Sequence, residues 1–95
     1  MDAPALRSGE VVLRSGAANH RRGLEAVGGK LFLTNHRLIF VSHGLNIQSG
    51  PAYFELSAIV GAGRSGVLRN WLTVRFSDGN AKFAVFRPSL WIRAI

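Results

Sequence analysis

Six basic side chains are the residues of this sequence whose types and spacing could do chemistry. They are Arg14, His20, Arg21, Arg22, His36 and Arg37. Guanidinium groups form paired hydrogen bonds with phosphate and carboxylate oxygens, and binding groups gather in loops that a rigid sheet holds in place. We interpret these residues as a candidate binding site for an anion such as a lipid headgroup. The alternative is a set of unrelated, solvated side chains.

Two predicted turns would position this site. Arg14 closes the first predicted strand, and residues 20–22 follow just past the small residues of 16–19. These basic residues are therefore expected to frame the first hairpin loop, while His36 and Arg37 occupy the next turn.

A glycine-rich stretch further along matches the letters of a dinucleotide-binding motif. Residues 61–66 read GAGRSG, but that motif requires a helix after its third glycine and an acidic residue about 20 positions later. Residues 67–71 read instead as a strand, and no acidic residue lies near the required position. We interpret the stretch as a flexible loop between strands and expect no cofactor.

Metal binding and catalysis find no support in the residue pattern. His36 and His43 bracket one predicted strand, which places them about 23 Å apart at ~3.3 Å per residue. The acidic residues occur singly, at Asp2, Glu10, Glu25, Glu55 and Asp78. Because no nucleophile, base and orienting group are grouped together, we expect neither a metal site nor enzymatic activity.

The composition describes one small, basic domain. The chain has 95 residues, of which 47% are hydrophobic, and a net charge of +7, which favours anionic partners. It contains no cysteine, so thiolate chemistry is excluded, and a cytoplasmic location is expected, with peripheral attachment to membranes as an option. No targeting or membrane-spanning segment is apparent. Residues 1–8 are expected to form a flexible lead-in to a single domain over 9–95.

Short apolar runs separated by Gly, Asn and Ser indicate an all-β fold. The predicted strands cover residues 10–15, 22–28, 29–34, 37–43, 52–60, 66–76 and 80–87. Pro88 suits the first turn of a helix, and Trp91 with Ile95 would give that helix an apolar face. Because two helical turns are marginal alone, we expect the helix to dock on the sheet, against Trp71 and Phe86.

Two hairpins can be read in detail. If Thr34 faces Arg37 across Asn35-His36, then Leu33 faces Leu38, Phe32 faces Ile39 and Leu31 faces Phe40. Both faces of this hairpin are then apolar, so both require a cover.

The second hairpin is expected to turn at Asp78-Gly79, a strong signal for a tight turn. This register directs Phe76, Val74 and Leu72 inward and sets Arg75 opposite Lys82. Like charges directly opposite are destabilising, so this pair should lie in water or against an anion.

The run from Gly28 to Phe40, GGKLFLTNHRLIF, resembles the signature of the GRAM domain, a relative of the pleckstrin-homology (PH) fold. The likeness extends in order through residues 9–13, 54–59, 70–83 and 91–92. It implies a PH-like, bent, seven-stranded antiparallel sandwich or barrel capped by a C-terminal helix. It also implies membrane or phosphoinositide association and protein contacts rather than catalysis, with Arg14 and Arg21/Arg22 in the positions of the family's basic residues.

Three functions follow as hypotheses. The first is a non-catalytic GRAM-type module that binds phosphoinositide-like anionic lipid headgroups through its basic loops. The second is a protein-interaction or homodimerising module whose apolar surface lies around Phe32, Ile39, Val41, Trp71 and Phe86. Nucleic-acid binding is not favoured, because no stacking aromatics are interleaved with the basic loops.

Overall fold

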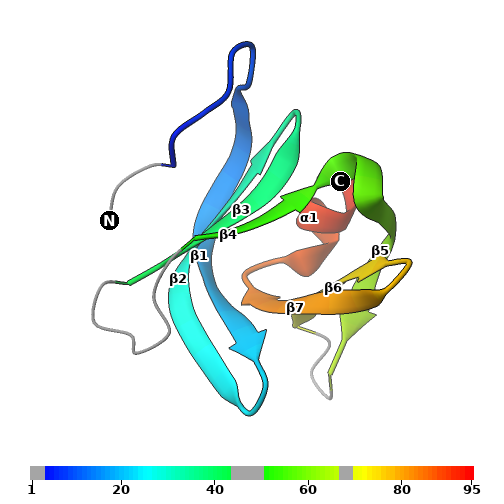
Figure 1. Ribbon diagram of the computed structural model, residues 1–95. Helices are drawn as coiled ribbons and strands as arrows, with labels where there is room; N and C mark the ends of the chain where they lie inside the picture. The colour runs from blue at the N-terminus through cyan, green and yellow to red at the C-terminus, as the bar shows by residue number, and fades with distance from the viewer. Residues whose placement is uncertain (1–3, 44–50, 67–69) are drawn as a thin grey trace.

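The architecture is one antiparallel sheet of seven strands followed by a helix, as the sequence predicts. The structure is a computed structural model that describes residues 4–43, 51–66 and 70–95. Its elements are β1 (Val12–Arg22), β2 (Glu25–Thr34), β3 (Arg37–Ser42), β4 (Ala52–Glu55), the 3₁₀ turn η1 (Leu56–Ala58), β5 (Ile59–Ser65), β6 (Trp71–Phe76), β7 (Gly79–Val85) and α1 (Pro88–Ala94). The strand order is β4-β3-β2-β1-β7-β6-β5 (Figure 1).

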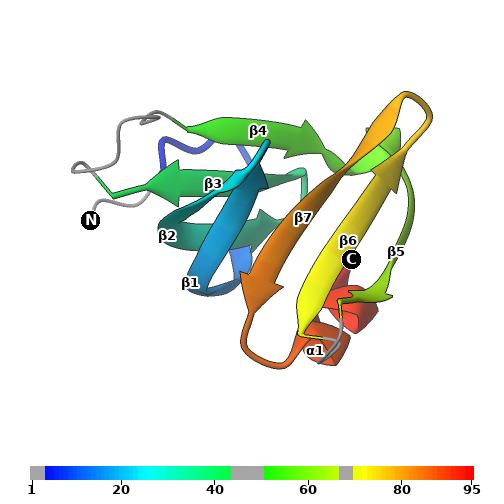
Figure 2. The same cartoon turned by 90° about the horizontal axis from the view of Figure 1, so that it is seen from below.

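The sheet bends over on itself, so that its two halves enclose the core. Figure 2 shows β1 to β4 on one side and β5 to β7 on the other, with α1 at one end. The core joins side chains from both halves, and its fully buried members include Leu31, Phe40, Leu72 and Phe83. Because β1 pairs with both β2 and β7, it connects the two halves.

The C-terminal helix docks on the sheet, but not against the predicted residues. Trp91 is 2% exposed and belongs to the core cluster, and α1 contacts β1, β5 and β6. Phe86 is 77% exposed, and Trp71 alternates with the buried Leu72, so it lies on the other face of β6. The prediction that the helix packs on Trp71 and Phe86 is therefore wrong, because Trp91 reaches the inner face of the sheet.

The hairpin of β2 and β3 has the predicted register. Leu33 pairs with Leu38, Phe32 with Ile39 and Leu31 with Phe40. The outer-face residues Phe32 and Ile39 are also buried, at 5% and 0% exposure. Near Arg37, the cover of this face includes the segment before β1, because Arg37 Nη2 donates to the Ala5 carbonyl at 2.9 Å.

The second hairpin keeps the predicted faces but not the predicted register. Phe76 pairs with Gly79, so the turn residues are Ser77 and Asp78, and Lys82 lies opposite Thr73 instead of Arg75. A type I′ turn at Asp78-Gly79 would need a positive φ at both residues, and among the described residues other than glycine only Arg87 has one. A shift of two residues preserves the alternation, so Leu72 and Val74 remain buried.

Two predicted loops are strands. The stretch 16–21 lies inside β1, whose hairpin turn comes later, at Gly23 and Leu24. Residues 61–65 lie in β5, so the glycine-rich stretch is not a loop between strands there. Small residues suggested turns in both places. In β1 they lie in the strand instead, and Gly16 packs beside Trp91, whose Cζ2 would lie 3.7 Å from a Cβ on that glycine. The predicted strand 52–60 is divided by η1, and residues 67–69 of the predicted strand 66–76, including Arg69, lie outside the described residues.

Candidate functional site

The strand β1 separates the basic residues that the sequence placed in one loop. Side chains alternate between the two faces of a strand, so Arg14, His20 and Arg22 face one way and Arg21 the other. The Arg14 guanidinium lies 5.4 Å from the centre of the Trp91 ring system, near α1. The prediction that these four residues frame one loop is wrong, because the loop is a continuous strand.

His20 is a core residue rather than a free binding group. Its ring stacks on Phe83 at a centroid distance of 4.7 Å and meets Phe40 and Phe54 edge-on at 5.1 and 5.8 Å. Arg22 Nε lies 3.3 Å from His20 Nδ1. Burial, reinforced by the positive charge of Arg22, lowers the pKa of His20 to about 4. The imidazole is therefore neutral at pH 7 and adds no charge to an anion site.

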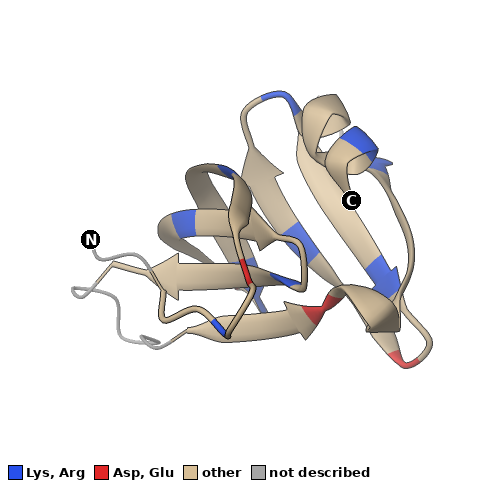
Figure 3. Cartoon of the chain, turned by 90° about the horizontal axis from the view of Figure 1, so that it is seen from above, with Lys and Arg blue, Asp and Glu red and all other residues tan. Residues whose placement is uncertain are grey.

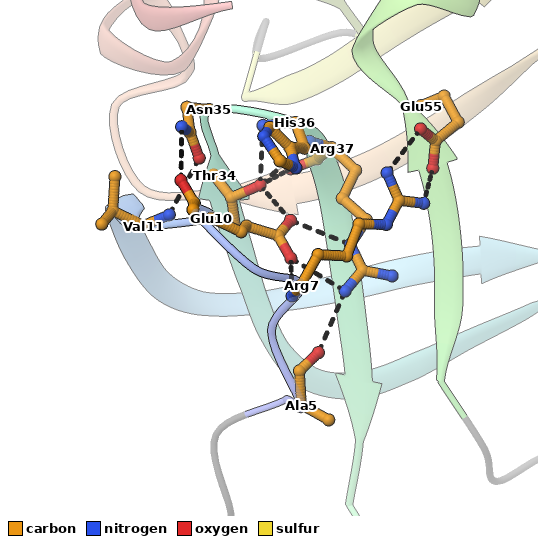
Figure 4. Close-up of polar contacts among 10 residues, drawn as sticks. Ala5, Arg7, Glu10, Val11, Thr34, Asn35, His36, Arg37 and Glu55 are labelled. Carbon is orange, nitrogen blue, oxygen red and sulfur yellow. Dashed lines mark hydrogen bonds and ion pairs between the residues drawn. The ribbon is translucent and has the colours of Figure 1, made fainter.

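Arg37 is likewise engaged inside the protein, in an ion pair with Glu10. Arg37 Nε lies 2.9 Å from Glu10 Oε2, and the side chains are 10% and 0% exposed (Figure 4). The Thr34 hydroxyl also donates to Glu10 and accepts from the backbone N–H groups of His36 and Arg37 at 3.0 and 2.9 Å. His36 is half-buried in this turn. The Arg37 side chain and the His36 backbone thus take part in the bonds that hold this turn together.

The arginine also sets the acidity of its partner. The hydrogen bond from Arg37 lowers the pKa of Glu10 to about 2, against the opposing effect of burial. We expect Arg37→Gln to raise the pKa of Glu10 from about 2 toward its ordinary 4.5, because the hydrogen bond that lowers this pKa most is lost while those from Thr34 and from the Arg7 N–H remain. An NMR titration of the Glu10 carboxyl carbon measures this. A carboxyl that still titrates near 2 would contradict the role given to Arg37.

The structure does bring two cationic side chains together, Arg21 and Lys82, of which only Arg21 was predicted from the sequence to be a site residue. A cavity of about 390 Å³ is lined by Arg21, Gly23, Asn80 and Lys82, and we call it the basic pocket. It forms where β1 and β7 stop pairing, since His20–Phe83 is the last pair on that side. The next residues along, Arg21 and Lys82, alternate with this buried pair and so lie on the outer face.

The side chains around the basic pocket are open to a ligand. Arg21 Nε donates to the Gly23 carbonyl at 3.3 Å, which directs the guanidinium toward the turn. Gly23 has a φ of 63°, which favours glycine. Lys82 makes no hydrogen bond or ion pair with other residues in the described ranges. No acidic residue is among the four that line the cavity.

Arg21 is the only residue of the predicted site that lines this pocket. Lys82 lines it too, but was not among the predicted site residues. The sequence did carry a signal for Lys82 as a binding residue, because this side chain was expected to face outward, toward water or an anion. Its partner in that expectation, Arg75, lies instead over β5, where a Cβ on Gly61 would come within 2.2 Å of Arg75 Nη2. Figure 3 shows basic segments on the neighbouring strands β6 and β7. What the sequence could not show is that β7 pairs with β1.

Comparison with known proteins defines the fold class. No protein-family model and no curated protein matches this chain. The C-terminal domain of an unknown protein from Leishmania infantum is similar, with a TM-score of 0.76 and 21% identity over 92% of this chain and 82% of its own. The Vps36 N-terminal PH domain has a TM-score of 0.76 and 23% identity over 96% of this chain and 80% of its own. The chain therefore has a PH-like fold, and the GRAM assignment stays a prediction.

The described residues contain neither a metal-binding cluster nor a membrane-spanning helix. Within 4–43, 51–66 and 70–95, no three His, Asp or Glu side chains are grouped so that they could hold a metal ion. None of the helical residues in those ranges forms a helix long and apolar enough to cross a membrane. Because Arg21 and Lys82 both line it, the basic pocket is the candidate site for the anion expected from the sequence.

Proposed function

We propose that this chain is a GRAM-type, non-catalytic binding module that holds the phosphate group of a lipid headgroup in its basic pocket. The observation that carries the proposal is the convergence of Arg21 and Lys82 on one cavity with no acidic residue in its lining. A guanidinium and an ammonium group together suit a phosphate, since the first binds two oxygens at once and the second acts as a point charge.

An apolar side chain beside the pocket supports a membrane as the place of binding. Leu24 lies at the turn between β1 and β2, next to Gly23 of the pocket, and is 100% exposed. A bilayer would bury it, for roughly 1.5–3 kcal/mol, and each nearby cation adds about 1 kcal/mol at an anionic surface. The sum corresponds to roughly millimolar affinity, so a tethered neighbour or self-association would be needed for stable attachment.

A sedimentation assay with phosphatidylcholine vesicles containing phosphatidylglycerol tests the proposal. Lys82→Gln and Arg21→Gln should each weaken binding about fivefold, the equivalent of about 1 kcal/mol per lost cation. The separate substitution Leu24→Ser should also weaken vesicle binding, because it removes the apolar contact with the bilayer. The matched control is Arg93→Gln, which removes an equal charge from an exposed position on α1 and should change affinity less than twofold. If all three charge variants lose the same affinity, the pocket is not the binding site.

The protein-interaction alternative has less surface than the sequence predicted. Of its five apolar residues, Phe32 and Ile39 are buried, Val41 and Trp71 are half-buried, and only Phe86 is largely exposed. The predicted patch is therefore wrong for Phe32 and Ile39, because the outer face of β2 and β3 is covered. Homodimerisation itself stays a prediction, which light scattering across a concentration series would test.

A further inference from the structure

A second cavity of opposite chemistry adjoins the basic pocket. It also measures about 390 Å³ and lies between β4 and the turn from β6 to β7. Its lining includes aromatic and acidic side chains, and we call it the acidic pocket: Tyr53, Phe54, Phe76, Glu55 and Asp78. Figure 3 shows the acidic segments at the end of β4 and in that turn. Two of the five acidic residues of a chain with net charge +7 thus line one cavity.

The two pockets share a residue, Asn80, which lines both. The two cavities are therefore neighbours, with Asn80 between them. On one side lie the cations Arg21 and Lys82. On the other lie aromatic rings and carboxylates, the groups that recognise ammonium ions.

The availability of the two carboxylates differs. Glu55 is paired with Arg7, whose Nη1 donates to Glu55 Oε1 at 2.9 Å, so much of its charge is compensated. Asp78 is exposed and makes no ion pair with any residue in the described part of the chain. Phe54 and Phe76 stack at 5.6 Å, and Tyr53 is 51% exposed. The Tyr53 ring already lies 4.9 Å from the Arg37 guanidinium, so Asp78 is the group that a cation entering from solvent would meet.

We propose that the two pockets together take a phosphate joined through a short linker to an ammonium group, as in phosphoethanolamine. The inference rests on the proposed function, because the phosphate would lie between Arg21 and Lys82. The ammonium group would then lie beside Asp78, across Asn80. The same unit occurs in phosphatidylethanolamine and as a free phosphomonoester.

The acidic pocket also argues against a polyphosphate ligand. A headgroup with further phosphates would place negative charge next to Asp78 and Glu55, and like charges at short range repel. This favours a zwitterionic headgroup over the phosphoinositide-like one expected from the sequence. The substitution Asp78→Asn should therefore have opposite effects on the two kinds of ligand.

NMR titration of the full chain measures whether Asp78→Asn raises or lowers the affinity for each ligand. The probes are O-phosphoethanolamine, inorganic phosphate and inositol trisphosphate. Asp78→Asn should weaken phosphoethanolamine binding about fivefold, the size of one exposed charge pair, without weakening phosphate, and should strengthen inositol trisphosphate. Lys82→Gln should weaken all three. Because Asp78 lies exposed in a turn, its variant should fold, and Arg93→Gln serves as the charge control.

The outcomes separate this inference from the proposed function. If phosphate binds and depends on Lys82, but phosphoethanolamine binds no more tightly or ignores Asp78→Asn, the inference is overturned and the proposed function stands. If none of the probes depends on Lys82, both fail. Vesicles show whether the ligand is a lipid or a free phosphomonoester. Replacing part of the phosphatidylglycerol by phosphatidylethanolamine lowers the negative surface charge. If the ligand is a lipid, this replacement should nevertheless strengthen binding, through Asp78. Binding of the soluble probe alone would support a free phosphomonoester.

Discussion

Replacing Trp91 by alanine is expected to cost about 3–5 kcal/mol of the free energy of unfolding, as for other buried tryptophans. Trp91 is 2% exposed and joins α1 to the core cluster. Its ring lies against Gly16, and glycine has no side chain that could move into the space left by the ring. Since a whole domain is stable by only about 5–15 kcal/mol, the variant should be marginally folded.

Chemical denaturation followed by circular dichroism measures this loss. The control is Phe86→Ala, which removes another large aromatic side chain next to the same helix, but one that is 77% exposed. Surface substitutions of this kind usually change stability by less than about 0.5 kcal/mol. Equal losses in the two variants would show that the helix does not depend on its buried tryptophan.

The second large effect is a loss of stability below neutral pH through His20. The folded protein holds the pKa of His20 at about 4, while the unfolded chain has the ordinary value of 6.5. Below 6.5 the unfolded chain therefore binds a proton that the folded protein does not. The resulting destabilisation grows as the pH falls and is complete near 4, at about 3 kcal/mol.

Urea denaturation at a series of pH values tests this, with His20→Leu as the comparison. The variant should lack this part of the pH dependence, whatever its stability at pH 7. Glu10 acts in a different window, because its pKa is lowered from 4.5 to about 2, so its stabilising effect is lost only as the pH falls through that range. Parallel stability curves for the wild type and His20→Leu between pH 6.5 and 4.5 would refute the assignment to His20.

The sequence by itself determined the fold class, the register of one hairpin and the buried face of another. The register of β2 with β3 was predictable because its turn residues and its apolar pairs lie within a few positions of each other. The inward face of β6 was predictable too, since a shift of two residues leaves the alternation of Leu72 and Val74 unchanged. The basic character of the chain was likewise evident from its net charge of +7.

Only the tertiary structure decided which charged residues are available to a ligand. Arg37 and His20 looked like binding residues, yet each contacts a partner distant in sequence. Arg37 pairs with Glu10, and His20 stacks on Phe83. Conversely, Arg21 and Lys82 are 61 positions apart and share a pocket because β1 pairs with β7. The pattern of one strand records which of its faces is buried, whereas its neighbour in the sheet is chosen by packing across the whole core.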